Sequence, residues 1–365
     1  MSYKSIDILQ RSLASTIFST KKDAKKAAGR ALGTIVEIIT YYLLREWGYT
    51  PNIQIETKLP EFGNSEITHN VEFTLHRIHH VEKHNIVSPL TYTGVRKLFG
   101  FVHQKNKSGS FIDKENIIKN SAIIGKDGNL LAVCNLVDDE IILSFLPEQA
   151  AAMFECKRVG VEEGQKKGPQ TIEKAKQGAY VALKSSSLQK IRDKYGNVYG
   201  VYFKDGVMHT EKYEDALIDC MQSDRLEDFI LSFGVISNHG NWFTSKDMNW
   251  FTSKDMNKEL KVLAQSYDRL LFLTDEGLYS FIERTILQPL PEYLPIQNAF
   301  IGSYREGKKT NTFTKSKISI DAHIALTKFF KENISLVENW FNVISPDGMT
   351  IEEIKQQLYK LLYKK

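Results

Sequence analysis

Helix-like and strand-like segments alternate along most of this chain, and this alternation is the feature that most limits how it can fold. Apolar residues first recur at helical spacing, so we predict one long helix over about 22–47, capped by Thr20 and followed by Gly48. Residues 52–59 and 67–78 then follow as strands. The pattern predicts an α/β fold with a mixed central β-sheet flanked by helices.

The rest of the chain continues this alternation. Further strands are predicted on both sides of a turn at 126–128 and over 141–146, 150–159, 198–206, 228–237 and 268–274. Further helices are predicted over 170–192, 212–222, 321–341 and 351–364. Residues from about 80 to 120 are polar and are interpreted as an insertion around a short helix at 93–102. We therefore expect a core over residues 1–290 and an additional helical C-terminal subdomain over 291–365.

Composition narrows the class of protein. Apolar residues make up 42% of the 365 residues and charged residues 25%, which excludes a wholly disordered or fibrous chain. No uninterrupted apolar run approaches the roughly 20 residues of a membrane span, so no membrane association is expected. Cys134, Cys156 and Cys220 are odd in number and widely spaced. A disulfide framework is therefore not expected, and the cysteines favour a reducing, cytoplasmic location.

Positive charge is concentrated in two parts of the chain. The net charge is only +4, but residues 151–194 contain ten Lys or Arg against five Asp or Glu, and residues 301–365 contain eleven against seven. Clusters of this kind suit a polyanionic partner, although a solvated basic surface gives the same pattern.

The predicted strand over 150–159 carries the most informative residues. Alternate side chains of a strand share a face, so Glu155 and Lys157 point to one side and Phe154 and Cys156 to the other. A carboxylate and an ammonium group on such an apolar strand are unfavourable unless they pair with each other or bind an ion. The pair is thus either a structural salt bridge or part of an ion site.

In its context, this Glu-Cys-Lys strand resembles the corresponding strand of the PD-(D/E)xK nuclease superfamily, and within it the type II restriction endonucleases. A helix precedes it in an αβββαβ order of elements, and a basic stretch and a second helix follow it. The resemblance covers about residues 28–205 as a pattern of elements, and only the Glu-Cys-Lys strand matches closely in sequence. It implies a restriction-endonuclease-like core and a Mg²⁺-dependent endonuclease that hydrolyses double-stranded DNA as part of a restriction system, with a homodimer expected.

The resemblance also implies a set of metal ligands. Glu155, an acid on the preceding strand and the backbone carbonyl of Cys156 would bind Mg²⁺, which prefers hard oxygen ligands. Lys157 would orient the attacking water or stabilise the developing charge.

Two acids are candidates for the ligand on the preceding strand. Asp139 begins the strand over 141–146, and a turn after that strand would bring it back antiparallel to the strand that carries Glu155. The family pattern has Pro before this acid, whereas this chain has Asp138. Glu72 is the alternative, and choosing it would make the 82 residues between it and Glu155 a large insertion. We place Asp139 slightly ahead of Glu72.

Other candidate residues flank this centre. Glu37 on the first long helix and Gln177 on the helix after the Glu-Cys-Lys strand are second-shell candidates. The candidates for contacts with DNA phosphates are Lys166, Lys167, Lys174 and Lys176. For each of these residues, a position on the solvated surface is the alternative.

Two other functions are compatible with the sequence. One is a non-catalytic DNA-binding protein on a nuclease-like fold. The other is an unrelated α/β enzyme in which Glu155 and Lys157 form only a structural pair, although the chain lacks the common phosphate-binding and hydrolase motifs. The identical repeats NWFTSKDM at 241–248 and 249–256 are interpreted as a duplication in a surface loop.

Overall fold

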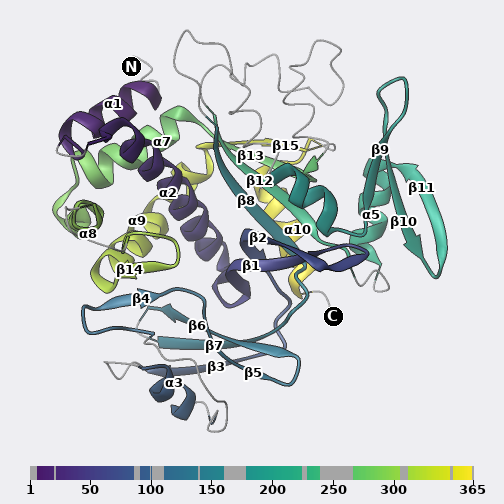
Figure 1. Ribbon diagram of the computed structural model, residues 1–365, viewed down its shortest axis with the longest axis horizontal. Coiled ribbons are helices and arrows are strands. Elements are labelled where there is room, and N and C mark those ends of the chain that lie inside the picture. The colour runs from purple at the N-terminus through teal and green to yellow at the C-terminus, as the bar shows by residue number, and fades with distance from the viewer. Residues whose placement is uncertain are drawn as a thin grey trace. The chain divides into compact units, whose positions relative to one another are not determined.

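The computed structural model describes most of the chain, as two compact units (Figure 1). Unit 1 comprises Met1–Ile55, Leu75–Glu148 and Glu276–Trp340, and unit 2 comprises Glu56–Thr74, Gln149–Asp275 and Phe341–Lys365. The residues described are 6–19, 22–85, 91–98, 100, 111–138, 140–159, 178–223, 228–238, 266–304, 311–345 and 348–363. The C-terminal region predicted over 291–365 coincides with neither unit, because 291–340 belong to unit 1 and 341–365 to unit 2.

Unit 1 contains most of the helices. Its elements include α1 (Ile6–Thr16), α2 (Ala24–Leu44), η1 (Arg45–Tyr49), η2 (Thr50–Asn52), α3 (Tyr92–Leu98), α7 (Asp275–Ile282), η4 (Glu283–Leu287), η5 (Pro291–Tyr293), α8 (Leu294–Ser303) and α9 (Ile320–Glu338). The short helix predicted at 93–102 corresponds to α3, and the one predicted at 321–341 corresponds to α9.

The long N-terminal helix, α2, forms as its apolar spacing predicts. Asp23 is its N-cap, because its side chain accepts a hydrogen bond from the Lys26 amide at 3.2 Å. The predicted cap, Thr20, lies outside the described residues. After η1 begins, Gly48 adopts a φ of 88°, a conformation that glycine reaches without strain.

The helical run Ala24–Asn52 is long and apolar enough to cross a membrane by length and composition, although charged residues such as Arg30 and Glu37 interrupt its apolar sequence. Some 67% of its apolar window is nevertheless buried inside the protein, as in a core helix.

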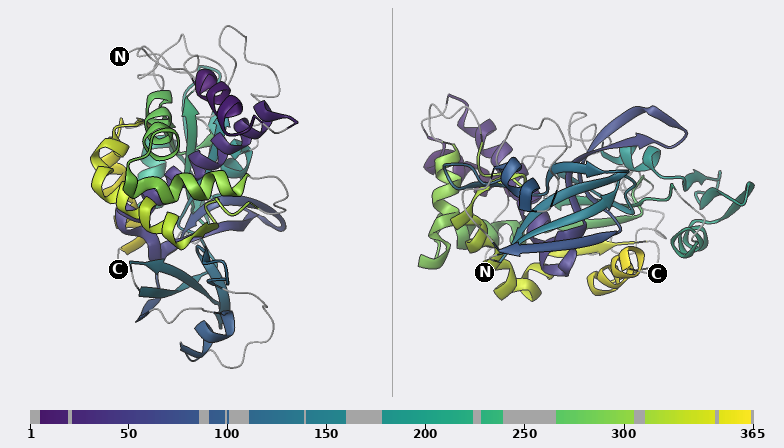
Figure 2. Two further views of the ribbon diagram at one scale, coloured as in Figure 1. Left: turned by 90° about the vertical axis from the view of Figure 1, so that its left-hand side faces the viewer. Right: turned by 90° about the horizontal axis from the view of Figure 1, so that it is seen from below.

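A four-stranded antiparallel sheet occupies the middle segment of unit 1 (Figures 1 and 2). Its strands are β3 (His80–Asn85), β5 (Ala122–Asp127), β6 (Leu130–Val137) and β7 (Glu140–Pro147), in the order β3-β7-β6-β5. The turn predicted at 126–128 joins β5 to β6 as expected. A further pair, β4 (Ile117–Lys119) and β14 (Lys317–Ser319), forms a small antiparallel ribbon.

The predicted partner of β7 is wrong. We expected residues 141–146 to pair with the Glu-Cys-Lys strand, but β7 lies between β6 and β3. The tight turn after β6 makes this local antiparallel pairing available, with Val137 opposite Glu140.

A six-stranded mixed sheet forms the centre of unit 2 and confirms the predicted α/β fold class. Its strands are β1 (Ile53–Glu61), β2 (Asn64–Leu75), β8 (Ala152–Val159), β12 (Leu231–Asn238), β13 (Arg269–Leu273) and β15 (Phe341–Ile344), in the order β1-β2-β8-β12-β13-β15. β12 is parallel to both β8 and β13, whereas β15 is antiparallel to β13. Residues 178–185 are helical and lie between β8 and β12 in the chain.

β8, the Glu-Cys-Lys strand, is an interior strand of this sheet. One face packs through Phe154, whose ring stacks on that of Phe233 in β12 at 4.3 Å between centroids. The other face belongs to an apolar cluster in which Met153 joins Ala179 and Ala182 from the helical residues 178–185. Glu155 and Lys157 follow Met153 at alternate positions and therefore share this second face.

A smaller module completes unit 2, together with α10 (Ile351–Tyr363). It consists of the antiparallel strands β9 (Gln189–Arg192), β10 (Val198–Lys204) and β11 (Val207–Lys212), followed by α5 (Tyr213–Gln222). The helix predicted over 170–192 is wrong at its end, because Gln189–Arg192 are a strand paired with β10. The serine run 185–187 explains this, since serine side chains compete with the helical backbone for hydrogen bonds.

Candidate active site

Glu155 is a buried carboxylate with two different hydrogen-bond donors. Its side chain is 5% exposed, and Lys157 Nζ donates to its Oε1 at 2.5 Å. Its Oε2 accepts a hydrogen bond from the backbone amide of Glu72 at 3.3 Å. The Lys157 side chain is 25% exposed, so the pair opens to solvent only on the lysine side. Glu155 and Lys157 are therefore a charged pair held inside the sheet, as their spacing predicts.

The neighbouring strand brings Glu72 to this pair. β2 lies directly beside β8, although 75–148 between them belong to unit 1. The large insertion that the Glu72 alternative requires is thus present in the fold. The Glu72 amide donates to a side-chain oxygen of β8, so the Glu155 carboxylate lies against the backbone of β2 at this point.

The strand pairing that favoured Asp139 as the second metal ligand does not form. Asp139 lies outside the described residues, and β7, the strand that it precedes, pairs in the unit 1 sheet rather than with β8. The antiparallel hairpin that was expected to carry Asp139 to the neighbourhood of Glu155 is absent from the described strands.

A glycine and a tyrosine enclose the Glu155–Lys157 pair. A Cβ atom on Gly178 would lie 2.5 Å from the Tyr267 hydroxyl, 2.6 Å from Glu155 Cγ and 3.2 Å from Lys157 Cε. Real Cβ atoms do not approach other heavy atoms to 2.6 Å, so only glycine fits here without a shift. The first described helical residue therefore packs directly on the charged pair.

Tyr267 fits into this site because a second glycine leaves room for its ring. A Cβ on Gly234, the residue opposite Glu155 in β12, would lie 2.7 Å from the ring of Tyr267. The tyrosine is buried, and burial together with the nearby Glu155 carboxylate raises the pKa of its phenol well above the ordinary value. The phenol therefore stays protonated and uncharged beside Glu155.

Sequence reasoning did not identify Gly178, Gly234 or Tyr267. A glycine inside a helical pattern, as at 178, is the one signal that pointed to a close contact. Tyr267 has no comparable local signal, because its contact with Gly234 joins β12 to a residue that lies just before β13.

The other candidate residues are distributed differently. Glu37 lies in α2 of unit 1, where its Oε2 pairs with Lys315 Nζ at 3.0 Å. Its second-shell role stays a prediction. Five further candidates lie outside the described residues: Lys166, Lys167, Lys174, Lys176 and Gln177. The NWFTSKDM repeats over 241–256 also lie outside them.

The donor set around Glu155 fits a hard divalent cation by its chemistry. Glu155 supplies a carboxylate, the kind of ligand that Mg²⁺ prefers, whereas Glu72 contacts it through its backbone amide. Val71 lies in the apolar cluster with Met153, so strand alternation places the Glu72 side chain on the opposite face of the sheet. Within the part of the chain that the structure describes, no three His, Cys, Asp or Glu side chains form a ready-made metal cluster. A cation here would thus rest on Glu155 and on oxygens of the backbone or solvent, which suits Mg²⁺ better than a transition metal.

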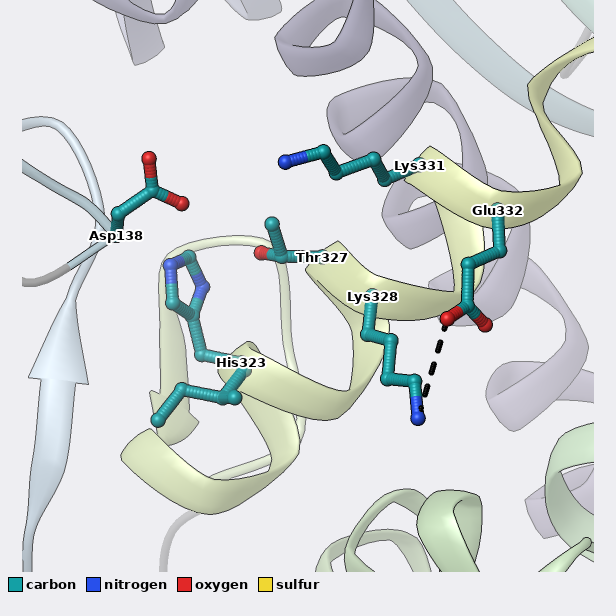
Figure 3. A pocket seen from close by; sticks show the side chains of 7 residues that line it. Asp138, His323, Thr327, Lys328, Lys331 and Glu332 are labelled. Carbon is teal, nitrogen blue, oxygen red and sulfur yellow. Dashed lines mark ion pairs between the residues drawn. The ribbon is translucent and has the colours of Figure 1, made fainter.

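A separate pocket in unit 1 has mixed charge (Figure 3). Asp138 and Lys331 point into it from opposite sides, with His323 and Thr327 between them. His323 Nδ1 hydrogen-bonds with the Tyr42 hydroxyl at 2.7 Å, and burial, with the Arg45 charge adding to it, lowers the pKa of the imidazole well below its ordinary value. The imidazole is therefore neutral, and the two opposite charges leave the pocket without a net preference for an anion.

Comparisons with known proteins identify no relative of this chain. No protein-family model, curated protein or solved structure matches the chain. Functional inference therefore depends on the residues of this chain and their geometry.

Proposed function

We propose that this protein is a Mg²⁺-dependent endonuclease that hydrolyses double-stranded DNA, of the type II restriction class, and that it acts as a cytoplasmic homodimer. The observation that carries the proposal is the buried Glu155 carboxylate, shared between Lys157 on its own strand and the Glu72 amide on the next. A Glu-x-Lys strand and an acid on the preceding strand are the constellation that the resemblance to PD-(D/E)xK nucleases implies.

The order of elements supports the same proposal. Along the chain, α2, β1, β2, β8, the helical residues 178–185 and β12 occur in αβββαβ order once the unit 1 segment Leu75–Glu148 and the intervening elements β9 to α5 are both set aside. β8 and β12 run parallel, as a helical crossover between neighbouring strands requires. With β2 beside β8, we now propose Glu72 ahead of Asp139 as the second acid.

Each residue of the site has a specific task in this proposal. Glu155 and the backbone carbonyl of Cys156 would hold the cation, and Glu72, whose carboxylate would have to reach it from the other face of β2, is the proposed second acid. When bound, Mg²⁺ supplies a coordinated water of lowered pKa and neutralises charge on the phosphate. Lys157 would hold the attacking water or the phosphate oxygen with its ammonium protons, from the solvent-facing side of the pair.

Tyr267 and Gly178 keep that geometry fixed. The buried phenol ring and the glycine contact leave Glu155 little freedom to move away from the β2 side of its strand. A dense arrangement of this kind favours positioning of the carboxylate before substrate arrives.

The direct test is cleavage of plasmid DNA of known sequence with and without Mg²⁺. Discrete fragments that require Mg²⁺ support the proposal, and Glu155→Gln, Lys157→Met and Glu72→Gln should each abolish them. Glu148→Gln is the matched control, because Glu148 forms an exposed ion pair with Lys126 in unit 1. Binding of the plasmid without cleavage at any Mg²⁺ concentration would favour the non-catalytic DNA-binding alternative instead.

A further inference from the structure

The β9–β10–β11 sheet has one covered face and one open face (Figure 1). On the covered side, a Cβ on Gly200 would lie 2.4 Å from the Cβ of Ala216, so α5 packs directly on the middle strand. Alternation then directs the neighbours of Gly200 to the other side. The open face consists of eight residues in cross-strand register: Gln189, Ile191, Tyr199, Val201, Phe203, Met208, Thr210 and Lys212.

Large side chains are exposed on this face. Phe203 and Met208 are directly opposite each other in register and are 55% and 61% exposed. Tyr199 lies four residues before Phe203 on the same strand, about 13 Å away at the rise of a β-strand. Phe203 is exposed and Tyr199 is half-buried, and aromatic groups spaced along one strand form flat surfaces on which planar groups can stack.

The turn that joins β9 to β10 presents a further aromatic ring in a fixed position. Tyr195 is 78% exposed, yet its backbone amide donates to Asp193 Oδ1 at 2.9 Å. The Asn197 amide donates to the same oxygen at 2.9 Å, and Arg192 Nη1 donates to the Gly196 carbonyl at 2.7 Å. A ring held out to solvent by a braced turn loses little conformational entropy when it binds a ligand.

The charge on the open face itself favours an anionic ligand, although the Asp193 carboxylate lies in the turn that carries Tyr195. Lys212 is the one charged residue of the open face, and Lys194 Nζ lies 5.0 Å from the centre of the Tyr195 ring. The carboxylates of Glu211 and Asp219 lie on the covered side instead, where both accept hydrogen bonds from the Tyr202 hydroxyl. A polyanion can therefore approach the open face without meeting a carboxylate on it.

The module is firmly joined to the central sheet of unit 2. Lys190 of β9 pairs with Asp268 at 2.8 Å, and the side chains of both residues are buried. Asp268 also accepts hydrogen bonds from the Tyr213 hydroxyl and from the Ser232 amide. These contacts connect β9 and α5 to β12, the strand next to β8, so the open face is rigidly attached to the sheet that carries Glu155.

We propose that the open face and Tyr195 bind an unpaired strand of nucleic acid. Bases would stack on Tyr195, Tyr199 and Phe203, while Lys194 and Lys212 would contact phosphates. Stacking on these rings needs bases that are splayed apart, so the open face should bind single strands in preference to an intact duplex. This interaction is distinct from the proposed cleavage of duplex DNA, and its test does not use cleavage.

The test measures binding of a fluorescent single-stranded oligonucleotide and of the matching duplex by anisotropy, without Mg²⁺. Phe203→Ala and Tyr195→Ala should each weaken single-strand binding roughly tenfold and leave duplex binding unchanged, since one aromatic–base stack contributes about that factor. Both residues are exposed, so the fold should survive. Tyr359→Ala on α10, where the side chain is 61% exposed, is the matched control and should change neither affinity.

Two results would overturn the proposal. One is equal single-strand affinity in wild type, Phe203→Ala and Tyr195→Ala. The other is a loss of self-association in Phe203→Ala, seen by sedimentation, without a change in single-strand affinity, because the open face would then be an interface between two copies of the chain. Loss of single-strand affinity in a variant that still cleaves duplex DNA would support the open face as a separate site.

Discussion

Replacing Gly178 with alanine should destabilise the protein, the reverse of the usual effect in a helix. Alanine is favoured over glycine by about 1 kcal/mol in a helix interior. At this position, however, the new Cβ would approach Tyr267 Oη to 2.5 Å and Glu155 Cγ to 2.6 Å. Neither group can move easily, because Tyr267 is buried and both oxygens of Glu155 are engaged. Overpacking of this kind costs roughly 1–3 kcal/mol, and the upper part of that range outweighs the helical gain.

We therefore expect Gly178→Ala to lower the free energy of unfolding by about 1–2 kcal/mol and to displace Glu155. Urea unfolding followed by circular dichroism measures the first effect, and Mg²⁺-dependent cleavage measures the second. Gly33→Ala in α2 is the matched control, since its added Cβ has no heavy atom within 4 Å, and it should stabilise the protein by about 0.5–1 kcal/mol. A Gly178→Ala variant as stable as Gly33→Ala would refute the close packing on Glu155.

Three further predictions concern stability. Asp268→Asn should cost about 3 kcal/mol in urea unfolding, because it leaves the buried Lys190 ammonium without its carboxylate. Burial lowers the pKa of His323, so at acidic pH the unfolded chain binds a proton that the folded chain does not. Unfolding curves should therefore show the free energy of unfolding falling as the pH drops below about 6.5. The fall should be smaller in His323→Gln. Asp23→Ala should lower the free energy of unfolding by about 1 kcal/mol, because it removes the cap on the Lys26 amide. Asp23→Asn, measured in the same way, should keep most of the stability that the cap contributes.

Local patterns predicted most elements because their causes are local. The helical spacing after Asp23 and the turn at 126–128 involve residues close in sequence, and both formed as expected. The alternation of Glu155 and Lys157 on one face is likewise a property of a single strand. These features could be predicted without knowledge of the pairing of distant strands.

The partner of the Glu-Cys-Lys strand could not be predicted in the same way. β2 and β8 are neighbours although the segment Leu75–Glu148 between them folds in unit 1. Sequence proximity favoured β7 and thus Asp139, whereas the sheet order favours Glu72. Strand pairing over such a separation leaves no mark on the local periodicity of either strand, so the choice between the two acids needed the fold.

Cleavage by Glu155→Gln tests the central claim most directly. The substitution keeps the size of the side chain and removes the charge that pairs with Lys157 and would bind the cation. Purified wild type and Glu155→Gln, shown by circular dichroism to be folded, would be incubated with the same plasmid across a range of Mg²⁺ concentrations. We predict discrete Mg²⁺-dependent fragments with wild type and at least a hundredfold lower rate with the variant, as expected when an electrostatic contribution to catalysis is removed. Equal rates for the two proteins would contradict the assignment of Glu155 as the metal-binding carboxylate.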